Sequence, residues 1–152
     1  MTTMRDVVEP LQAVLAAEHA VVFGYGVVGA HLRGPDRRRA SDELARHRDQ
    51  RDALTSQLVA LGAEPAQTAA AYELPHPVTS TDEARDLAAV LETRLAGVWA
   101  DAVLALPARQ RAEEAAGLRE QAIAGLQAAA VASATWRGGS VPFPGLPERS
   151  RP

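Results

Sequence analysis

Three ionisable side chains stand at helix positions that should be apolar, and they are the residues best suited to do chemistry. Over residues 11–32 apolar side chains recur every three or four positions, and Glu18 lies on that stripe. Over residues 44–61 His47 and Arg51 lie on the equivalent stripe. Burying such groups costs several kcal/mol unless they are paired or bound to a metal. We therefore predict that Glu18, His47 and Arg51 share one buried site.

Tyr25 follows Glu18 by two helical turns, so we predict that its hydroxyl hydrogen-bonds into the same site. An arginine and a histidine in a partly enclosed cleft suit a small carboxylate or phosphate better than a bare cation. The leading prediction is a non-catalytic network of Glu18, Tyr25, His47 and Arg51 that is structural or binds a small anionic ligand. No cofactor is expected with this arrangement.

The alternative is a metal site formed by Glu18, Glu43, His47 and Glu92. Two-metal carboxylate sites in helix bundles take one glutamate from each of two helices and Glu-x-x-His from each of the other two. Here Glu43 and His47 are four residues apart, and no histidine follows the glutamates of the last helix at that spacing. The sequence therefore leaves a single iron or manganese ion, in a degenerate oxidoreductase, as the metal-binding hypothesis.

Residues 33–51 carry many arginines, and this arginine-rich face gives a third hypothesis, a partner-binding or RNA-binding module. Asp36, Asp42 and Asp49 are interleaved with the arginines. Mixed charges at helical spacing are typical of a solvated, salt-bridged surface. The segment lacks aromatic residues for base stacking, and the chain has a net charge of −3, so nucleic acid is a disfavoured partner.

Residues 24–30, with the sequence GYGVVGA, match the dinucleotide-binding fingerprint G-x-G-x-x-G/A. That fingerprint requires a strand before it and a full helix after it, within a parallel sheet. Here Gly34-Pro35 follows the motif after about one turn, and no later segment has a strand pattern. We interpret the glycines as helix positions that let a neighbouring helix approach closely.

Four helices are predicted, at about residues 9–32, 39–61, 80–106 and 108–136. Pro10 fits the first turn of the first helix, and Gly34-Pro35 ends that helix. Ser80 or Thr81 caps the start of the third helix, with acidic residues in its first turn, and Gly138 ends the fourth. No segment alternates with period two, so the predicted fold class is all-α.

The lengths of the connections predict how these helices are arranged. Short links join the first helix to the second and the third to the fourth, whereas residues 62–79 form a long connection with three prolines. Two antiparallel hairpins joined by a crossover form a ferritin-like four-helix bundle. We assign residues 1–137 to this domain. The proline-rich tail, residues 138–152, is predicted to pack on the bundle through Phe143 and Leu146.

The composition agrees with a single cytoplasmic domain of 152 residues. The chain has no cysteine, which excludes disulfides, thiolate metal sites and a cysteine nucleophile. The longest apolar run, residues 20–30, is shorter than the roughly 20 residues that span a bilayer, so no membrane association is expected. A homodimer through helix faces is expected, with Trp99 or Trp136 as a candidate contact.

Several landmarks together resemble a family of small actinobacterial ferritin-like proteins of unknown function. They are Glu18-His19, residues 25–30, residues 47–52, residues 72–75, Glu92, Trp136-Arg137 and residues 142–145. The resemblance covers nearly the whole chain and implies a ferritin-like four-helix fold. It implies no activity, and the chain lacks both Glu-x-x-His motifs of ferritins and di-iron oxidases.

Overall fold

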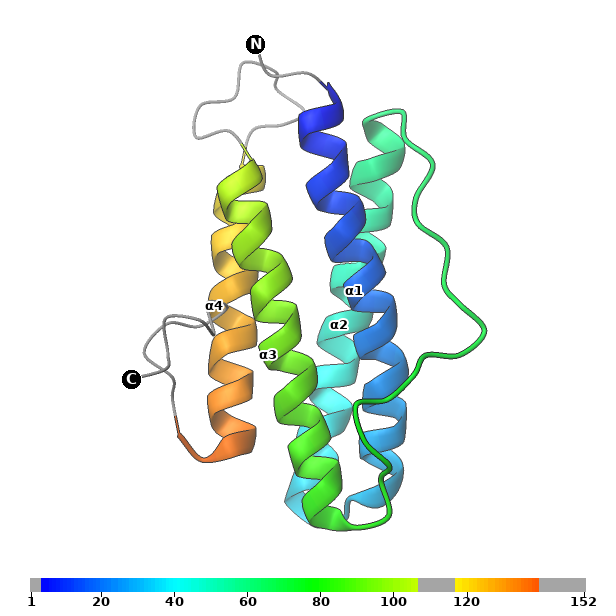
Figure 1. The fold of residues 1–152 in the computed structure, drawn as a ribbon, viewed down its shortest axis with the longest axis vertical. Coiled ribbons are helices and arrows are strands. Elements are labelled where there is room, and N and C mark those ends of the chain that lie inside the picture. Colours follow the sequence, from blue (N-terminus) through cyan, green and yellow to red (C-terminus); the bar gives the residue numbers. More distant parts are fainter. Residues whose placement is uncertain (1–3, 107–116, 140–152) are drawn as a thin grey trace.

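The computed structural model describes residues 4–106 and 117–139, which form four α-helices and no strand. The helices are α1 (Met4–His31), α2 (Gly34–Ala60), α3 (Thr81–Ala105) and α4 (Leu118–Arg137). They lie along the long axis of the molecule, with α1 running away from the N-terminus and α2 returning (Figure 1). The all-α, four-helix prediction is confirmed. The predicted tail contacts of Phe143 and Leu146 lie outside the described residues.

The second helix begins earlier than the sequence predicted. It starts at Gly34 rather than near Arg39, and Pro35 lies in its first turn. A proline is tolerated there because the first backbone N–H groups of a helix have no partner within the helix. The pair Gly34-Pro35 therefore starts α2 as well as ending α1, and only residues 32–33 separate the two helices.

Helix α1 also begins earlier than predicted, at Met4, which places Pro10 inside the helix rather than in its first turn. Val7 and Leu11 are buried one turn apart, so core packing extends the helix in spite of the hydrogen bond that Pro10 removes. Length and composition alone would let α1 cross a membrane. In this fold it is a core helix, with Leu11 and Leu15 fully buried.

A capping box fixes the start of α3. The Ser80 side chain accepts a hydrogen bond from the backbone N–H of Glu83, at 3.2 Å, and Glu83 Oε2 accepts one from the backbone N–H of Ser80, at 3.1 Å. Each side chain satisfies a backbone donor that the helix leaves unpaired. Helix α3 therefore begins at Thr81, and Ser80 is the one of the two predicted hydroxyl residues that caps it.

The core lies where α1 packs against α2 and α3, and where α3 packs against α4. Long polar side chains connect α2 to α4: Gln57 donates to Gln121 at 2.8 Å, and the Arg39 guanidinium lies 5.3 Å from the centre of the Trp136 ring. Trp99 and Trp136 are both buried within the chain. Neither tryptophan therefore provides the exposed dimer contact that the sequence predicted.

The connection between α2 and α3, residues 61–80, runs along the outside of the molecule beside α1 (Figure 1). It is tied to that helix by Gln12, whose side-chain oxygen accepts a hydrogen bond from the backbone N–H of Ala66 at 2.8 Å. The rings of Phe23 and Tyr72 also meet, with centroids 5.6 Å apart. These contacts cover the outer surface of α1 near the middle of the bundle.

The glycine motif lies within helix α1, as the sequence predicted, and no strand precedes it among the described residues. A Cβ atom on Gly24 would come within 2.5 Å of the Leu91 side chain of α3. Gly24 therefore permits close approach of the two helices. Gly26 and Gly29 would meet nothing within 4 Å, so the expected role in packing applies to the first glycine only.

Gly125 of α4 is packed more tightly, because a Cβ atom there would lie 2.4 Å from the rigid ring of the buried Trp99. The Gly125→Ala substitution is expected to lower the free energy of unfolding by about 1–3 kcal/mol through overpacking. Urea denaturation followed by circular dichroism measures this. The matched control is Gly26→Ala, which should raise stability by roughly 0.5–1 kcal/mol. Equal effects of the two substitutions would contradict this packing argument.

Candidate functional site

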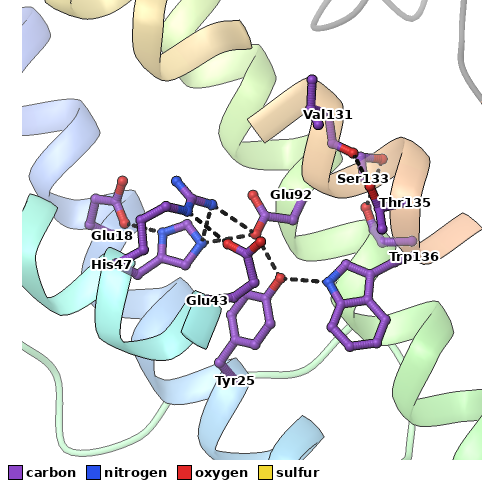
Figure 2. Close-up of polar contacts among 11 residues, drawn as sticks. Glu18, Tyr25, Glu43, His47, Glu92, Val131, Ser133, Thr135 and Trp136 are labelled. Atoms are coloured by element: carbon purple, nitrogen blue, oxygen red, sulfur yellow. Dashed lines mark hydrogen bonds and ion pairs between the residues drawn. The ribbon is translucent and has the colours of Figure 1, made fainter. Parts of the chain in front are cut away.

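Three ionisable side chains meet at the centre of the bundle, each from a different helix. Glu18 comes from α1, His47 from α2 and Glu92 from α3 (Figure 2). Their exposed fractions are 1%, 0% and 0%, so none of them is in contact with bulk water. Each stands on the core stripe of its helix, and the packing of α1 against α2 and α3 turns the three stripes toward one another.

The His47 ring lies between the two buried carboxylates. Its Nδ1 atom is 2.8 Å from Glu18 Oε2, and its Nε2 atom is 2.9 Å from Glu92 Oε1. Burial lowers the pKa of His47, but the hydrogen bonds to Glu18 and Glu92 outweigh this effect and raise the pKa to about 9. At neutral pH the ring is therefore an imidazolium that donates to a carboxylate on each side.

Tyr25 and Trp136 extend this network toward α4 (Figure 2). The Tyr25 hydroxyl donates to Glu92 Oε1 at 2.6 Å and accepts from Trp136 Nε1 at 3.0 Å. The Tyr25 ring also stacks on His47, with centroids 5.3 Å apart. Burial has the largest effect on the pKa of Tyr25 and raises it, and the charge of Glu92 raises it further. The hydroxyl therefore keeps its proton and remains a donor.

The arginine at this site is Arg46, whereas the sequence predicted Arg51. Arg46 Nε donates to Glu43 Oε2 at 2.7 Å, and Arg46 Nη2 lies 3.4 Å from Glu92 Oε1. Burial lowers the pKa of Arg46, but the charge of Glu92 and the hydrogen bond to Glu43 raise it overall. Six residues thus form what we call the central cluster: Glu18, Tyr25, Glu43, Arg46, His47 and Glu92.

The structure turns Arg51 away from the central cluster. Its guanidinium pairs with Asp52, the next residue, at 2.8 Å. The long arginine stem can lie along the helix while its charged end reaches water, and this is why its place on the core stripe did not bring it inside. Arg51 is therefore not part of the site for which the sequence predicted a small anionic ligand, and Arg46 is the arginine beside His47.

A second geometric feature concerns Glu43, a half-buried residue one turn before His47. Glu43, His47 and Glu92 each offer one ligand atom, and these three atoms lie within 4.8 Å of one another. They are three of the four residues predicted as metal ligands. The fourth, Glu18, is hydrogen-bonded to the opposite nitrogen of His47. The arrangement therefore has three candidate ligand residues, and the carboxylate of Glu18 contacts the ring nitrogen of His47 that points away from them.

Two carboxylate oxygens of the central cluster have no hydrogen-bond partner among the described residues. They are Glu18 Oε1 and Glu92 Oε2, and both are buried. A buried, unpaired polar atom costs about 1–3 kcal/mol, and more when it is charged, so native structures contain few of them. Glu92 belongs to the set of candidate ligands, and one of its two oxygens has no hydrogen-bond partner among the described residues.

A surface pocket of about 560 Å³ adjoins the central cluster on α2. Arg46 lines it, together with Asp42, Asp49 and Gln50. A second pocket of about 530 Å³ lies between the first turns of α1 and the end of α3, and it contains no member of the cluster. The first pocket therefore lets a solute approach Arg46 from the outer side of α2.

Three of the seven arginines in residues 33–51 form ion pairs within the described part of the chain, namely Arg39, Arg46 and Arg51. Arg39 lies 3.8 Å from Asp36, and Arg85 of α3 pairs with the same carboxylate at 2.7 Å. Arg46 pairs with Glu43 within the central cluster. Such internal pairing is what interleaved charges on a helix predict, and it reduces the positive charge that the face offers to a partner.

Sequence reasoning missed two members of this network, Arg46 and Trp136. Arg46 lies beside the core stripe rather than on it, and Trp136 was interpreted as a candidate dimer contact. The spacing of Glu43 and Arg46, three residues apart on one helix, is a signal for an ion pair that could have found the arginine. No local signal places Trp136 beside Tyr25, because the two residues are 111 positions apart.

Comparison with known proteins gives a family and a similar structure. Residues 10–148 match a family model described as a domain of unknown function, DUF4439. The fold is similar to the crystal structure of a conserved hypothetical protein, rv2844, from Mycobacterium tuberculosis, with a TM-score of 0.80 and 31% sequence identity. That match covers 90% of this chain and 98% of the other. No curated protein matches the sequence.

Proposed function

The chain belongs to the DUF4439 family, a domain of unknown function, and we propose that it is a metal-binding protein whose central cluster holds one divalent transition-metal ion. The observation that carries this proposal is the grouping of Glu43, His47 and Glu92, with ligand atoms within 4.8 Å of one another. The unpartnered, buried oxygen of Glu92 supports it, because a cation would satisfy that oxygen.

The position of Glu18 also supports a metal ion at His47. Histidines that bind metals almost always hydrogen-bond through their other nitrogen to a carboxylate or a carbonyl, which fixes the ring and the tautomer. Glu18 Oε2 lies 2.8 Å from Nδ1, and Nε2 faces Glu92. We therefore propose Nε2 as the ligand atom and Glu18 as the residue that orients the ring.

The donor set indicates which metal ions would suit the site. Carboxylates favour manganese, imidazole favours iron and zinc, and the chain has no thiolate that would favour copper(I). We propose iron or manganese, one ion per chain. The described part of α4 contributes Trp136 to the network but no carboxylate or histidine, so a second ion would lack ligands.

We propose a ferritin-like arrangement for the bundle, in which α1, α2 and α3 all direct ionisable groups to the centre. This arrangement is supported by the long connection between α2 and α3 and by the packing of α1 on α2 and of α3 on α4. Without the two Glu-x-x-His motifs, we propose neither iron storage nor ferroxidase activity. The central cluster would hold one metal ion.

A second candidate function is structural, namely a metal-free ionic network that holds three helices in register. It is favoured by one observation: each nitrogen of His47 already faces a carboxylate, at 2.8 and 2.9 Å. An imidazolium between two carboxylates, with Arg46 as a second positive group near Glu92, would hold the three helices together without a metal. Metal content separates this candidate from the first.

Metal analysis by mass spectrometry of protein purified without a chelator or an affinity tag tests the proposal. We expect about one iron or manganese ion per chain after loading. The Glu43→Gln variant should bind the metal at least roughly 10–100-fold more weakly, since even substitutions of residues that only hydrogen-bond to the ligands have effects of that size. The matched control is Glu120→Gln on the exposed face of α4, which should bind like the natural protein. Less than about 0.1 ion per chain after loading would favour the structural network.

A further inference from the structure

One guanidinium touches all three candidate ligand residues. Arg46 Nε is 2.7 Å from Glu43 Oε2, and Nη2 is 3.1 Å from His47 Nε2 and 3.4 Å from Glu92 Oε1. Carboxylates and an imidazole nitrogen around a positive charge are also what a metal ion requires. Arg46 therefore fills the position of the cation in this structure.

We propose that Arg46 is a displaceable cation: a divalent metal ion enters the central cluster only when the guanidinium moves out into the surface pocket beside α2. This inference rests on the proposed function, because it concerns the regulation of the same site. Arg46 would keep the carboxylates paired while no metal is bound, and it would set how fast and how tightly metal binds.

The metal ion and the guanidinium cannot occupy the cluster together. A metal bound to His47 Nε2 and Glu92 Oε1 would lie about 2.1 Å from each atom. Those two atoms are only 2.9 Å apart, and Arg46 Nη2 is already 3.1 and 3.4 Å from them. The metal would therefore lie within a few ångströms of a second positive charge, where the repulsion is strong in a site shielded from water.

The inner position of Arg46 is held by few good contacts. Its bond to Glu43 is short, but the distance of 3.4 Å to Glu92 makes a weak hydrogen bond. The His47 Nε2 atom donates its proton to Glu92, so it has no lone pair for the neighbouring Arg46 Nη2. The Arg46 side chain is also 37% exposed, so it can leave without opening the bundle.

The surface pocket offers the guanidinium a second position. Asp42 and Asp49 line it with Arg46, four residues before and three residues after it on α2. Side chains at these spacings lie on one face of a helix and can form ion pairs. Both aspartates are exposed, and neither has an ion pair within residues 4–106 and 117–139. When the Arg46 guanidinium moves out, it therefore leaves the carboxylates of the central cluster and gains those of the two aspartates.

Titration of Mn²⁺ into metal-free protein, followed by calorimetry, tests the displacement. The Arg46→Gln variant keeps a side chain that can hydrogen-bond to Glu43 but removes the charge, so it should bind Mn²⁺ about tenfold or more tightly than the natural protein. The matched control is Arg48→Gln, which removes the same charge from an exposed position two residues along α2. Its affinity should stay within about twofold of the natural value.

The outer position is tested by the double variant Asp42→Asn/Asp49→Asn. It should slow the association of Mn²⁺ several-fold in stopped-flow measurements, because the displaced guanidinium loses its acceptors. The same two changes made in the Arg46→Gln background control for the general loss of negative charge, and they should have little effect there. These aspartates are exposed, so the double variant is expected to fold normally, and circular dichroism checks each protein.

The results separate this inference from the proposed function. If the natural protein binds Mn²⁺ and Arg46→Gln binds it no more tightly, the displacement is wrong while the metal site stands. If neither protein binds Mn²⁺ and neither binds Fe²⁺ in the same titration, both are wrong. Tighter binding by Arg46→Gln, together with an effect of the aspartates only when Arg46 is present, supports the displacement.

Discussion

Replacing His47 with alanine is expected to lower the free energy of unfolding by about 3–5 kcal/mol, the cost of breaking a buried ion pair by removing one partner. His47 is fully buried, and it is the only described group that pairs with Glu18. Without the ring, the Glu18 carboxylate is left buried without a partner, and a cavity remains between α1 and α2. Urea denaturation of chelator-treated protein at pH 7, followed by circular dichroism, measures the loss.

The control for this substitution is His76→Ala in the connection between α2 and α3. Its Nδ1 atom contacts only the backbone oxygen of Pro77, so the change should stay within about 0.5 kcal/mol. A loss below about 1 kcal/mol for His47→Ala would show that the two glutamates do not depend on a charged histidine. The same variant should also lose bound metal, but the stability measurement is independent of metal because it is made with chelator present.

Raising the pH is expected to destabilise the metal-free protein, with His47 as the cause. The folded-state pKa of His47 is about 9, and the ordinary value is 6.5. Because the folded pKa is the higher one, the stabilisation is fully present below pH 6.5 and is lost as the pH rises through about 9. The total loss is roughly 3 kcal/mol, with a slope of up to about 1.4 kcal/mol per pH unit between the two values.

Urea denaturation at several pH values between 6 and 9.5 tests this dependence. The Tyr25 pKa is also raised, so its effect on stability begins above pH 10 and does not interfere. The His47→Ala variant is the internal control, because the difference between the two stability curves isolates His47 from the other three histidines. Parallel curves for the natural protein and the variant would contradict a charged His47.

The central cluster makes the same residues important for stability and for the proposed metal site. Three carboxylates share two basic side chains, His47 and Arg46, and two carboxylate oxygens stay unpaired among the described residues. An excess of negative charge in a buried site favours an added cation and disfavours an anion. This balance is why the structure shifts the preference from the small anionic ligand predicted from the sequence to a metal ion.

Much of the fold could be predicted because it depends on signals that are local in the chain. Apolar residues at helical spacing, Ser80 with Glu83 at the start of α3, and the left-handed Gly138 at the end of α4 act within a few residues of where they stand. The errors were local too: Pro35 was interpreted only as the end of a helix, and the core contacts of Val7 extended α1 past Pro10. Packing extended α1, and propensity does not report packing, whereas the start of α2 follows the local rule that a proline is tolerated in the first turn.

The sequence by itself predicted that Glu18 and His47 would be buried, because each occupies a position on a core stripe, and it indicated Glu92 only as a candidate metal ligand. It could not determine how the stripes meet or which long side chain would reach the centre. Only the tertiary structure brought Trp136 to Tyr25 and placed Arg46, rather than Arg51, among the carboxylates. The physical reason is that backbone periodicity fixes the direction of a short side chain, whereas an arginine places its charge wherever the surrounding helices supply partners.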